Sequence, residues 1–486
     1  MDILFLIPPR ELNKEKMSVD RVYGCNYGFD YKPAIHLLLL ATVAEESGCD
    51  VRFLDCPGQG YNLQKFNRYI ADNRSIDMVV FFTVWLSAQE DLLAAEIISN
   101  LIKKAKIIFT GSYPTWKPEV FIKNNNYSVI RGEPEKPLVD FIKFCKSPDN
   151  NINEIQNLSF KKQAEVVNND PGGLIDIDKL PMPDHKLLKG RYFFNRVNAW
   201  PATVMCVSRG CAYSCNYCAP HALDQAIEIE YLKHNLGKPP MRLRSIENVV
   251  REFKHISSLG YRGVEICDNQ FVWDKERTME VCERIKGLNL QWICYARADH
   301  LKDRDMLRLM RRAGCELIYI GTESFSQMIL NDINKEMSVK DIYKAVNLVK
   351  ECGIEPEVSV LLGASAMETE ETILHSTKEA KKMKTNFIHY SIAAPLPNTR
   401  LYKISKEKGW LKNGEFVPID NIQDALLDLP NINAQRLKAI IRRCYAQKYL
   451  SLHFILWQIF SLNFLQKFSF KIRTLFKLLK YTYKSR

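Results

Sequence analysis

The sequence predicts an α/β protein in which two parallel-sheet regions follow one another and a helical region ends the chain. Three observations predict this fold class. Apolar strand-like runs alternate with helix-like runs in two series, a polar stretch separates the series, and the end of the chain is basic. Strands that alternate with helices form parallel sheets. We therefore expect domains at residues 1–145 and 196–415, a linker at 146–195 and a helical C-terminal region at 416–486.

The first series consists of short, uniformly apolar strands. Such strands are typical of a parallel sheet that is buried on both faces. The strand-like runs are residues 3–7, 50–55, 78–83 and 106–110, and the helix-like runs include residues 35–47 and 89–104. The polar residues 147–173 follow and predict the linker, because Asn pairs and a Pro-Gly-Gly turn interrupt them.

The second series contains six strand-like runs, each followed by a helix-like run. Six βα units are too few for a closed eight-stranded barrel, so we expect an open, partial (β/α)6 barrel of the TIM type. In βα barrels the site lies at the C-terminal ends of the strands. The six runs are residues 202–207, 264–267, 291–296, 317–321, 358–362 and 387–393.

A C-x-x-x-C-x-x-C motif formed by Cys211, Cys215 and Cys218 follows the first strand of this series. Three thiolates can hold three irons of a 4Fe–4S cluster and leave the fourth iron open. The alternative is a zinc site, which takes four N or S ligands, usually from two separated pairs. Cys206 could supply a fourth ligand, but the chain has no second C-x-x-C.

The chain holds 14 cysteines without the pattern of a disulfide scaffold, and no secretory signal opens it. Scattered cysteines of this kind fit a reducing compartment. We therefore expect a cytoplasmic protein, which would also protect an oxygen-sensitive cluster.

The cysteine motif, with the aromatic Tyr217 before its last cysteine, resembles the signature of the radical S-adenosylmethionine superfamily. The resemblance implies that Cys211, Cys215 and Cys218 hold a 4Fe–4S cluster. It also implies that S-adenosylmethionine binds the open iron and is split to a 5′-deoxyadenosyl radical. An electron donor such as flavodoxin or ferredoxin is implied as a partner.

Three further elements carry this resemblance, and each ends a predicted strand. Asp268 lies in a segment similar to D-D-x-F, Arg297 ends the third strand, and Glu323 lies in Gly-Thr-Glu-Ser, similar to G-x-E-S. The resemblance implies that Asp268 approaches the amino group of S-adenosylmethionine, Arg297 its carboxylate and Glu323 its ribose, with Tyr217 beside them. Singly, these residues also fit a turn cap, a surface charge and a helix-start acid.

The sequence departs from the family pattern at two places. Asn269 stands where the family has a second Asp, and residues 363–369 read G-A-S-A-M-E-T where the family has G-x-P-G-E-T. The second departure removes a Pro-Gly turn expected to contact the adenosine.

Residues 1–145 resemble the cobalamin-binding, Rossmann-like domain that precedes this barrel in one large subclass. The resemblance implies cobalamin contacts at Thr83, Gly111, Ser112, Gly132 and Glu133. The D-x-H-x-x-G motif is absent, and the customary Gly-Gly is Gly111-Ser112, so cobalamin would bind without a histidine from that motif. The alternative is a domain kept as scaffold without the cofactor.

The net charge of +12 belongs to the end of the chain. Residues 429–486 hold twelve Lys or Arg and no acid, and the remaining 56 basic residues equal the 56 acidic ones. Residues 467–484 predict a basic amphipathic helix suited to an anionic membrane surface.

Residues 449–466 contain six polar side chains, which argues against a membrane span. The alternative is a helix packed on the barrel, and no nucleic-acid partner is expected.

These observations predict a radical S-adenosylmethionine enzyme, cobalamin-dependent, that methylates or otherwise modifies an unactivated carbon of an apolar or membrane-delivered substrate. A ring-forming or oxidative cyclase is the alternative chemistry. A non-enzymatic iron–sulfur or cobalamin sensor is the alternative class, but it would not need Asp268, Arg297 and Glu323.

Overall fold

A computed structural model gives the structure of most of the chain. The residues it describes are 1–13, 18–24, 31–147, 151–190, 192, 194, 199–218, 220–419, 424–451 and 454. The basic amphipathic helix predicted at residues 467–484 lies outside them. By their internal contacts the residues divide into two compact units: unit 1 is Met1–Phe194, Ala199–Ala212 and Ala219–Asn269, and unit 2 is Asn195–Asn198, Tyr213–Cys218 and Gln270–Arg486.

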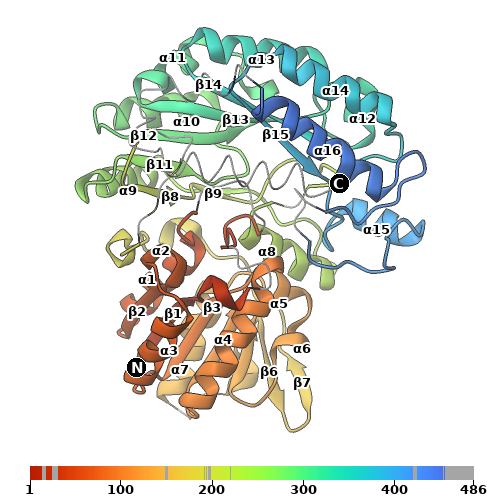
Figure 1. Ribbon diagram of the computed structural model, residues 1–486. Helices are drawn as coiled ribbons and strands as arrows, with labels where there is room; N and C mark the ends of the chain where they lie inside the picture. Colours follow the sequence, from red (N-terminus) through yellow and green to blue (C-terminus); the bar gives the residue numbers. More distant parts are fainter. Residues whose placement is uncertain are drawn as a thin grey trace. The chain divides into compact units, whose positions relative to one another are not determined.

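A seven-stranded sheet of order β2-β1-β3-β4-β5-β6-β7 is the frame of unit 1 (Figure 1). Strands β1 to β5 are parallel, as predicted, and β6 and β7 continue the sheet in antiparallel pairing. The strands are β1 Asp2–Ile7, β2 Asp50–Asp55, β3 Met78–Phe82, β4 Lys106–Thr110, β5 Tyr127–Ile130, β6 Leu158–Lys162 and β7 Glu165–Asn168.

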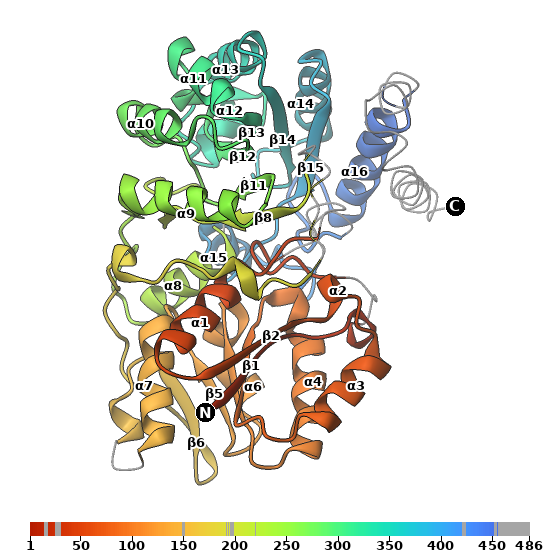
Figure 2. The same ribbon diagram turned by 90° about the vertical axis from the view of Figure 1, so that its left-hand side faces the viewer.

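Helices cover both faces of this sheet. Figure 2 shows α1 and α7 on one face and α3 and α4 on the other. All five residues of β3 are fully buried, which is the physical reason for the uniformly apolar strands. The helices are α1 Ile35–Glu46, α3 Leu63–Asp72, α4 Ala88–Leu101 and α7 Glu135–Lys146.

The stretch expected to be a linker contains the hairpin β6–β7 of this sheet. Gln163 turns the hairpin at a φ of 56°, and β6 pairs with β5. The sequence analysis did not predict the hairpin, because β7 reads Glu-Val-Val-Asn and none of its residues is buried. A half-solvated edge strand lacks the continuous apolar run that marks the parallel strands.

The six strand-like runs of the second series form six strands, each close to its predicted position. Within unit 1, β8 pairs in parallel with β11, and within unit 2, β12 to β15 pair in parallel in chain order. The strand order β15-β14-β13-β12-β11-β8 begins and ends with different strands, so the sheet is open. The strands are β8 Ala202–Met205, β11 Gly263–Ile266, β12 Gln291–Ala296, β13 Cys315–Glu323, β14 Glu355–Leu362 and β15 Phe387–Ile392.

Helices follow these strands in the expected rhythm. They are α9 Ile246–Ser258, α10 Lys275–Ile285, α11 Arg304–Arg312, α13 Val339–Glu351, α14 Glu370–Lys382 and α15 Arg400–Glu407. Most begin at a side-chain cap; Asp303, for example, accepts a hydrogen bond from the Met306 backbone N–H at 2.8 Å.

The C-terminal helical region begins with α16 (Ala434–Tyr449), which packs on β15. The Tyr449 hydroxyl donates to the Ile388 carbonyl at 2.7 Å and accepts from the Ile388 N–H at 3.0 Å. The Tyr445 hydroxyl makes the same two bonds with Tyr390, at 2.6 and 3.3 Å. Among the residues described, none forms a helix long and apolar enough to cross a membrane.

Candidate active site at the strand ends

The backbone of the cysteine motif is tied into unit 2 by hydrogen bonds with Ile333 and Asn334. Asn216 N–H donates to the Ile333 carbonyl at 3.0 Å, and Asn334 Nδ2 donates to the Ser214 carbonyl at 2.9 Å. Cys215 and Cys218 belong to unit 2, whereas Cys211 belongs to unit 1. Cys211 and Cys215 are half-buried and Cys218 is exposed, so the thiols lie in a segment that other groups can reach.

Tyr213, inside the motif, anchors it through its ring and its hydroxyl. The guanidinium carbon of Arg297 lies 3.6 Å from the centre of the Tyr213 ring, a close cation–π contact. The Trp273 ring stacks on Tyr213 with centroids 6.3 Å apart, and the hydroxyl lies 2.6 Å from His300 Nε2. The sequence analysis missed this role, although an aromatic residue between two cysteines was a visible signal.

Arg297 follows β12, at the C-terminal end that the sequence predicted. Its Nε and Nη2 donate to both carboxylate oxygens of Asp299, each at 3.0 Å, and Nη2 also donates to the carbonyl oxygens of Lys335 and Glu336. Asp299 therefore occupies one fork of the guanidinium. These contacts hold Arg297 rigidly, and Nη1 remains for a further acceptor.

Glu323 ends β13, with a left-handed φ of 60° that is uncommon for a residue other than glycine. Its Oε1 accepts from Lys335 Nζ at 2.9 Å and its Oε2 accepts from the Ser359 hydroxyl at 3.2 Å. A Cβ on Gly321 would lie 3.0 Å from Oε1, so the absent side chain makes room for the carboxylate.

Lys335 is a site residue that the sequence analysis did not find. Burial opposes its charge, but the neighbouring Glu323 raises its pKa, so the ammonium is retained. Its Nζ also donates to the Tyr217 hydroxyl at 3.2 Å, which joins Tyr217 to Glu323 through one cation. Burial raises the pKa of Tyr217 well above its ordinary value, so the hydroxyl keeps its proton. A lysine in a polar Asn-Asp-Ile-Asn-Lys run gave no sequence signal.

The segment that departs from the family's Pro-Gly turn is closed by Glu368. The Gly363 N–H donates to the Glu368 carboxylate, and Gly363 has a φ of 76°. Burial raises the pKa of Glu368 to about 8, more than the backbone hydrogen bonds lower it. A side chain therefore fixes this turn where the family uses proline and glycine.

Asp268 lies in unit 1, after β11, and both of its oxygens are engaged there. Oδ1 accepts from the Val207 N–H at 2.7 Å and Oδ2 accepts from the Ser208 hydroxyl at 2.6 Å. Burial raises its pKa to about 7. These bonds make Asp268 a residue that joins the ends of β8 and β11, and its predicted contact with S-adenosylmethionine stays a prediction.

Asn269, the other departure from the family, is explained by its neighbour Asp224. Asn269 Nδ2 donates to Asp224 Oδ2 at 2.7 Å and to the Gly210 carbonyl at 3.2 Å. The Gly210 N–H donates to the same Asp224 oxygen at 2.7 Å. An aspartate at position 269 would place two carboxylates together, whereas the amide helps to fix the residue before Cys211.

Three of the residues predicted to contact cobalamin lie together at the C-terminal ends of β3 and β4. These are Thr83, Gly111 and Ser112; the hydroxyls of Thr83 and Ser112, and that of Thr110, which was not predicted, are buried and have no hydrogen-bond partner among the described residues. A Cβ on Gly111, whose φ is 107°, would collide with the Thr83 carbonyl oxygen. Buried hydroxyls are normally hydrogen-bonded, so this edge fits a group that brings donors and acceptors.

Gly132 and Glu133, the other two predicted contacts, lie in a separate network. Glu133 pairs with Arg209 and with Arg242, whose Nη2 lies 2.9 Å away, and its Oε2 accepts from the Ile175 N–H at 2.9 Å. A Cβ on Gly132 would lie 3.2 Å from Glu230 Cβ in α8 (Ala222–Lys233). Burial works against ionisation of Glu133, but Arg209 lowers its pKa. Both residues therefore hold unit 1 together, and their predicted contacts with cobalamin stay predictions.

Comparison with known proteins finds relatives that match most of this chain. Residues 205–380 match the Radical SAM superfamily. An uncharacterised methyltransferase of Pyrococcus horikoshii is 26% identical over 472 residues, which cover 95% of each chain. An anaerobic magnesium-protoporphyrin IX monomethyl ester cyclase of Cereibacter sphaeroides is 24% identical over 394 residues, which cover 78% of this chain and 61% of the cyclase.

A solved structure shares the fold. It is that of OxsB, a cobalamin-dependent S-adenosylmethionine radical enzyme, with aqua-cobalamin and S-adenosylmethionine bound. The TM-score is 0.70 at 16% sequence identity, over 91% of this chain and 65% of OxsB. The chain thus spans just under two thirds of the length of that protein.

Proposed function

We propose that the chain is a cobalamin-dependent radical S-adenosylmethionine enzyme that methylates an unactivated carbon, and the match of residues 205–380 to the Radical SAM superfamily supports this proposal. When bound, the 4Fe–4S cluster and S-adenosylmethionine supply a carbon-centred radical and cobalamin supplies the methyl group. The cluster ligands we propose are Cys211, Cys215 and Cys218.

The arrangement of Tyr217, Lys335, Glu323 and Arg297 in unit 2 is the observation that carries the proposal. It offers one carboxylate, one ammonium and one guanidinium, each fixed by hydrogen bonds before a ligand arrives. S-adenosylmethionine carries the complementary groups, namely a carboxylate, ribose hydroxyls and an amine. We propose that Arg297 Nη1 takes the carboxylate and that Glu323 accepts from the ribose, since a carboxylate has lone pairs beyond its two present partners.

The cobalamin part of the proposal is supported by the edge of β3 and β4. Thr83, Thr110 and Ser112 offer buried hydroxyls without a partner, and Gly111 keeps the backbone open beside them. We propose that these residues bind polar groups of the cofactor, and that Gly132 and Glu133, which hold the turn after β5, contact it as well.

A second candidate is a ring-forming cyclase. The resemblance to the anaerobic magnesium-protoporphyrin cyclase over 78% of this chain favours it. The two reactions differ in their products, because methylation consumes a methyl group from S-adenosylmethionine and cyclisation does not.

The substrate class and the partners are also proposals. We propose an apolar or membrane-delivered substrate and an electron donor of the flavodoxin or ferredoxin type. The basic C-terminal residues support peripheral contact with an anionic membrane, since each basic residue near such a surface contributes about 1 kcal/mol.

An anaerobic assay with dithionite tests the proposal. The reconstituted full chain should convert S-adenosylmethionine to 5′-deoxyadenosine, and Cys215→Ala should reduce this to the level without protein. The buried Cys282→Ala, far from the motif in sequence, should remain active. With methyl-labelled S-adenosylmethionine, label should appear on added cobalamin; zinc in place of iron, or an active Cys215→Ala, would refute the proposal.

A further inference from the structure

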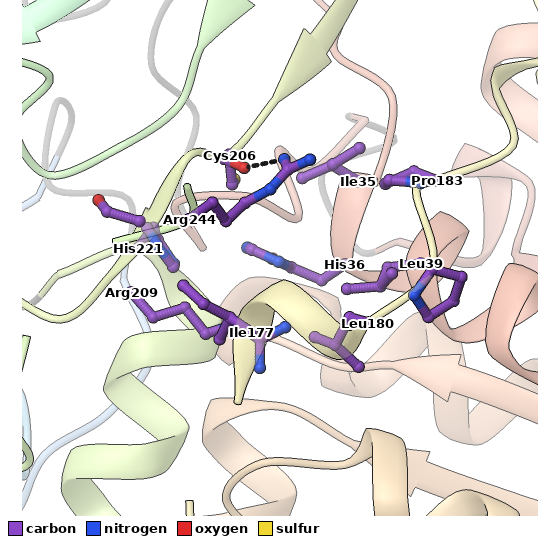
Figure 3. A pocket seen from close by; sticks show the side chains of 12 residues that line it. Ile35, His36, Leu39, Ile177, Leu180, Pro183, Cys206, Arg209, His221 and Arg244 are labelled. Carbon is purple, nitrogen blue, oxygen red and sulfur yellow. Dashed lines mark hydrogen bonds between the residues drawn. The ribbon is translucent and has the colours of Figure 1, made fainter. Parts of the chain in front are cut away.

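A small cavity within unit 1 is lined by three side chains that bind metals elsewhere in biology. His36 of α1, Cys206 after β8 and His221 before α8 each offer one ligand atom, and these atoms lie within 4.8 Å of one another. Figure 3 shows His36 and His221 pointing into the cavity from opposite sides. All three residues belong to unit 1, so one compact body fixes their arrangement.

Each of the two buried imidazoles has one ring nitrogen without a hydrogen-bond partner among the described residues, while His221 Nδ1 accepts from the Asp224 N–H at 3.5 Å. His36 is 6% exposed and His221 is 1% exposed, and Nε2 of each has no hydrogen-bond partner among the described residues. His221 Nε2 lies 3.0 Å from Asp224 Oδ2, but off the line that a hydrogen bond requires. Buried polar nitrogens are normally hydrogen-bonded, so two of them beside one cavity offer lone pairs to a ligand.

The two arginines that line the cavity do not exclude a cation, because acids neutralise both. Arg209 pairs with Glu133 and with Glu135, the latter at 2.5 Å. Arg244 pairs with Glu252 at 2.5 Å. Asp224 Oδ1 has no hydrogen-bond partner among the described residues and leaves a negative charge beside His221.

The cavity is large enough for a metal ion but too small for a larger ligand. Its volume is about 50 Å³, enough for a metal ion with a water or two and far too small for a corrin ring. Ligand atoms around tetrahedral zinc are about 3.3–3.6 Å apart, so the three side chains need to close by only about 1 Å.

From this geometry we propose that His36, Cys206 and His221 form a second metal site, separate from the iron–sulfur cluster, that binds zinc with water as the fourth ligand. Cys206 lies five residues before Cys211, and His221 lies three residues after Cys218. A metal on these ligands therefore pins both ends of the cysteine motif to α1. The site is structural for the motif, and it rests on unit 1 alone.

Metal analysis of the full chain tests this site. The anaerobically reconstituted protein, equilibrated with zinc and then desalted, should hold about one zinc besides about four irons per chain. In His36→Ala and in Cys206→Ala zinc should fall below about one tenth per chain, because losing one of three ligands abolishes tight binding. Cys267→Ala, which removes a fully buried thiol outside the proposed set, is the matched control and should keep its zinc.

Iron content separates this proposal from the proposed function, since the variants should lose zinc and keep iron. If a variant fails to fold, X-ray absorption at the zinc edge of the unaltered protein decides. It should show one sulfur at about 2.3 Å and two nitrogens at about 2.0–2.1 Å. Wild-type protein without zinc, zinc retained by Cys206→Ala, or a zinc shell with two or more sulfurs would overturn the proposal.

Discussion

The two sheets end their strands in different chemistry. At the ends of β3 and β4 in unit 1, hydroxyls are buried without partners, whereas at the ends of β12 and β13 in unit 2, charged groups are buried in pairs. The physical reason is the cost of leaving each kind of group alone. An unpaired hydroxyl costs about 1–3 kcal/mol, but removing the partner of a buried charge costs about 3–5 kcal/mol.

The difference teaches how a chain can prepare two sites before their ligands bind. Neutral groups such as hydroxyls can be buried without a hydrogen-bond partner until the ligand binds. Charged groups need an internal partner, and that partner must leave them a lone pair or an N–H with which to bind the ligand. The following variants break or sharpen this comparison, from the largest expected effect to the smallest.

Lys335→Met breaks the paired edge of unit 2. It leaves the Glu323 carboxylate, whose side chain is 13% exposed, without its cation, so the free energy of unfolding should fall by about 3 kcal/mol. Urea unfolding of the full chain measures this. Lys340→Met, at an exposed lysine of α13, should change stability by less than about 0.5 kcal/mol.

The double variant Glu323→Gln/Lys335→Met sharpens the same point. Removing both charges should recover much of the lost stability, because no buried charge then lacks a partner. A double variant as unstable as Lys335→Met alone would contradict the pairing argument.

Gly111→Ala tests whether the unit 1 edge depends on backbone space. The new Cβ would meet the Thr83 carbonyl oxygen at a φ of 107°, so we expect a loss of about 2 kcal/mol or more in unfolding free energy. Gly48→Ala is the control, since Gly48 also has a positive φ but nothing lies within 4 Å of a Cβ there. Equal losses in thermal unfolding would show that the left-handed backbone alone, without the collision, explains the result.

Stability near Glu368 should depend on pH. Burial raises its folded-state pKa to about 8, and Asp332 adds to this. The folded state therefore binds a proton that the unfolded state has lost, and stability falls as pH rises from about 4.5 to about 8, by at most about 1.4 kcal/mol per pH unit. Glu368→Gln should flatten this part of the curve in denaturant titrations at each pH. If the slope of unfolding free energy against pH were the same in Glu368→Gln as in the unaltered protein, a group other than Glu368 would cause the pH dependence.

Thr83→Val isolates one unpartnered hydroxyl in unit 1. Since the buried hydroxyl has no partner, replacing it with a methyl group should raise the unfolding free energy of the cofactor-free protein by about 1 kcal/mol or more. Cobalamin binding should weaken about tenfold, because one hydrogen bond of about 1.4 kcal/mol is lost. Absorbance titration with aquacobalamin measures this.

Thr115→Val is the matched control for that variant. The Thr115 hydroxyl donates to the Gly111 carbonyl at 2.7 Å and accepts from the Gly132 N–H at 3.0 Å, so its loss should cost about 1–3 kcal/mol of stability. If Thr83→Val destabilised the protein as much as Thr115→Val, the Thr83 hydroxyl would have an internal partner.

Sequence patterns predicted the parallel strands well because buried parallel strands are continuous apolar runs. They failed at β7, where an edge strand is half-solvated, and at β5, which is only four residues long. The places of Arg297 and Glu323 at strand ends were predictable because a motif and a strand end coincide, and their contacts with S-adenosylmethionine stay predictions. Lys335 was not predictable, because the fold of the chain places it beside Glu323 and no local sequence pattern indicates that contact.

The two tyrosines of α16 have a consequence for handling the protein. Strand β15 is an outer strand of its sheet, and the exposed N–H and C=O groups of such strands recruit other chains into aggregates. The hydroxyls of Tyr445 and Tyr449 occupy these groups at Tyr390 and Ile388. A chain that ends before residue 434 lacks α16 and should therefore self-associate. A chain that lacks only the basic C-terminal residues beyond Ser451 keeps α16 on the edge of β15 and should not.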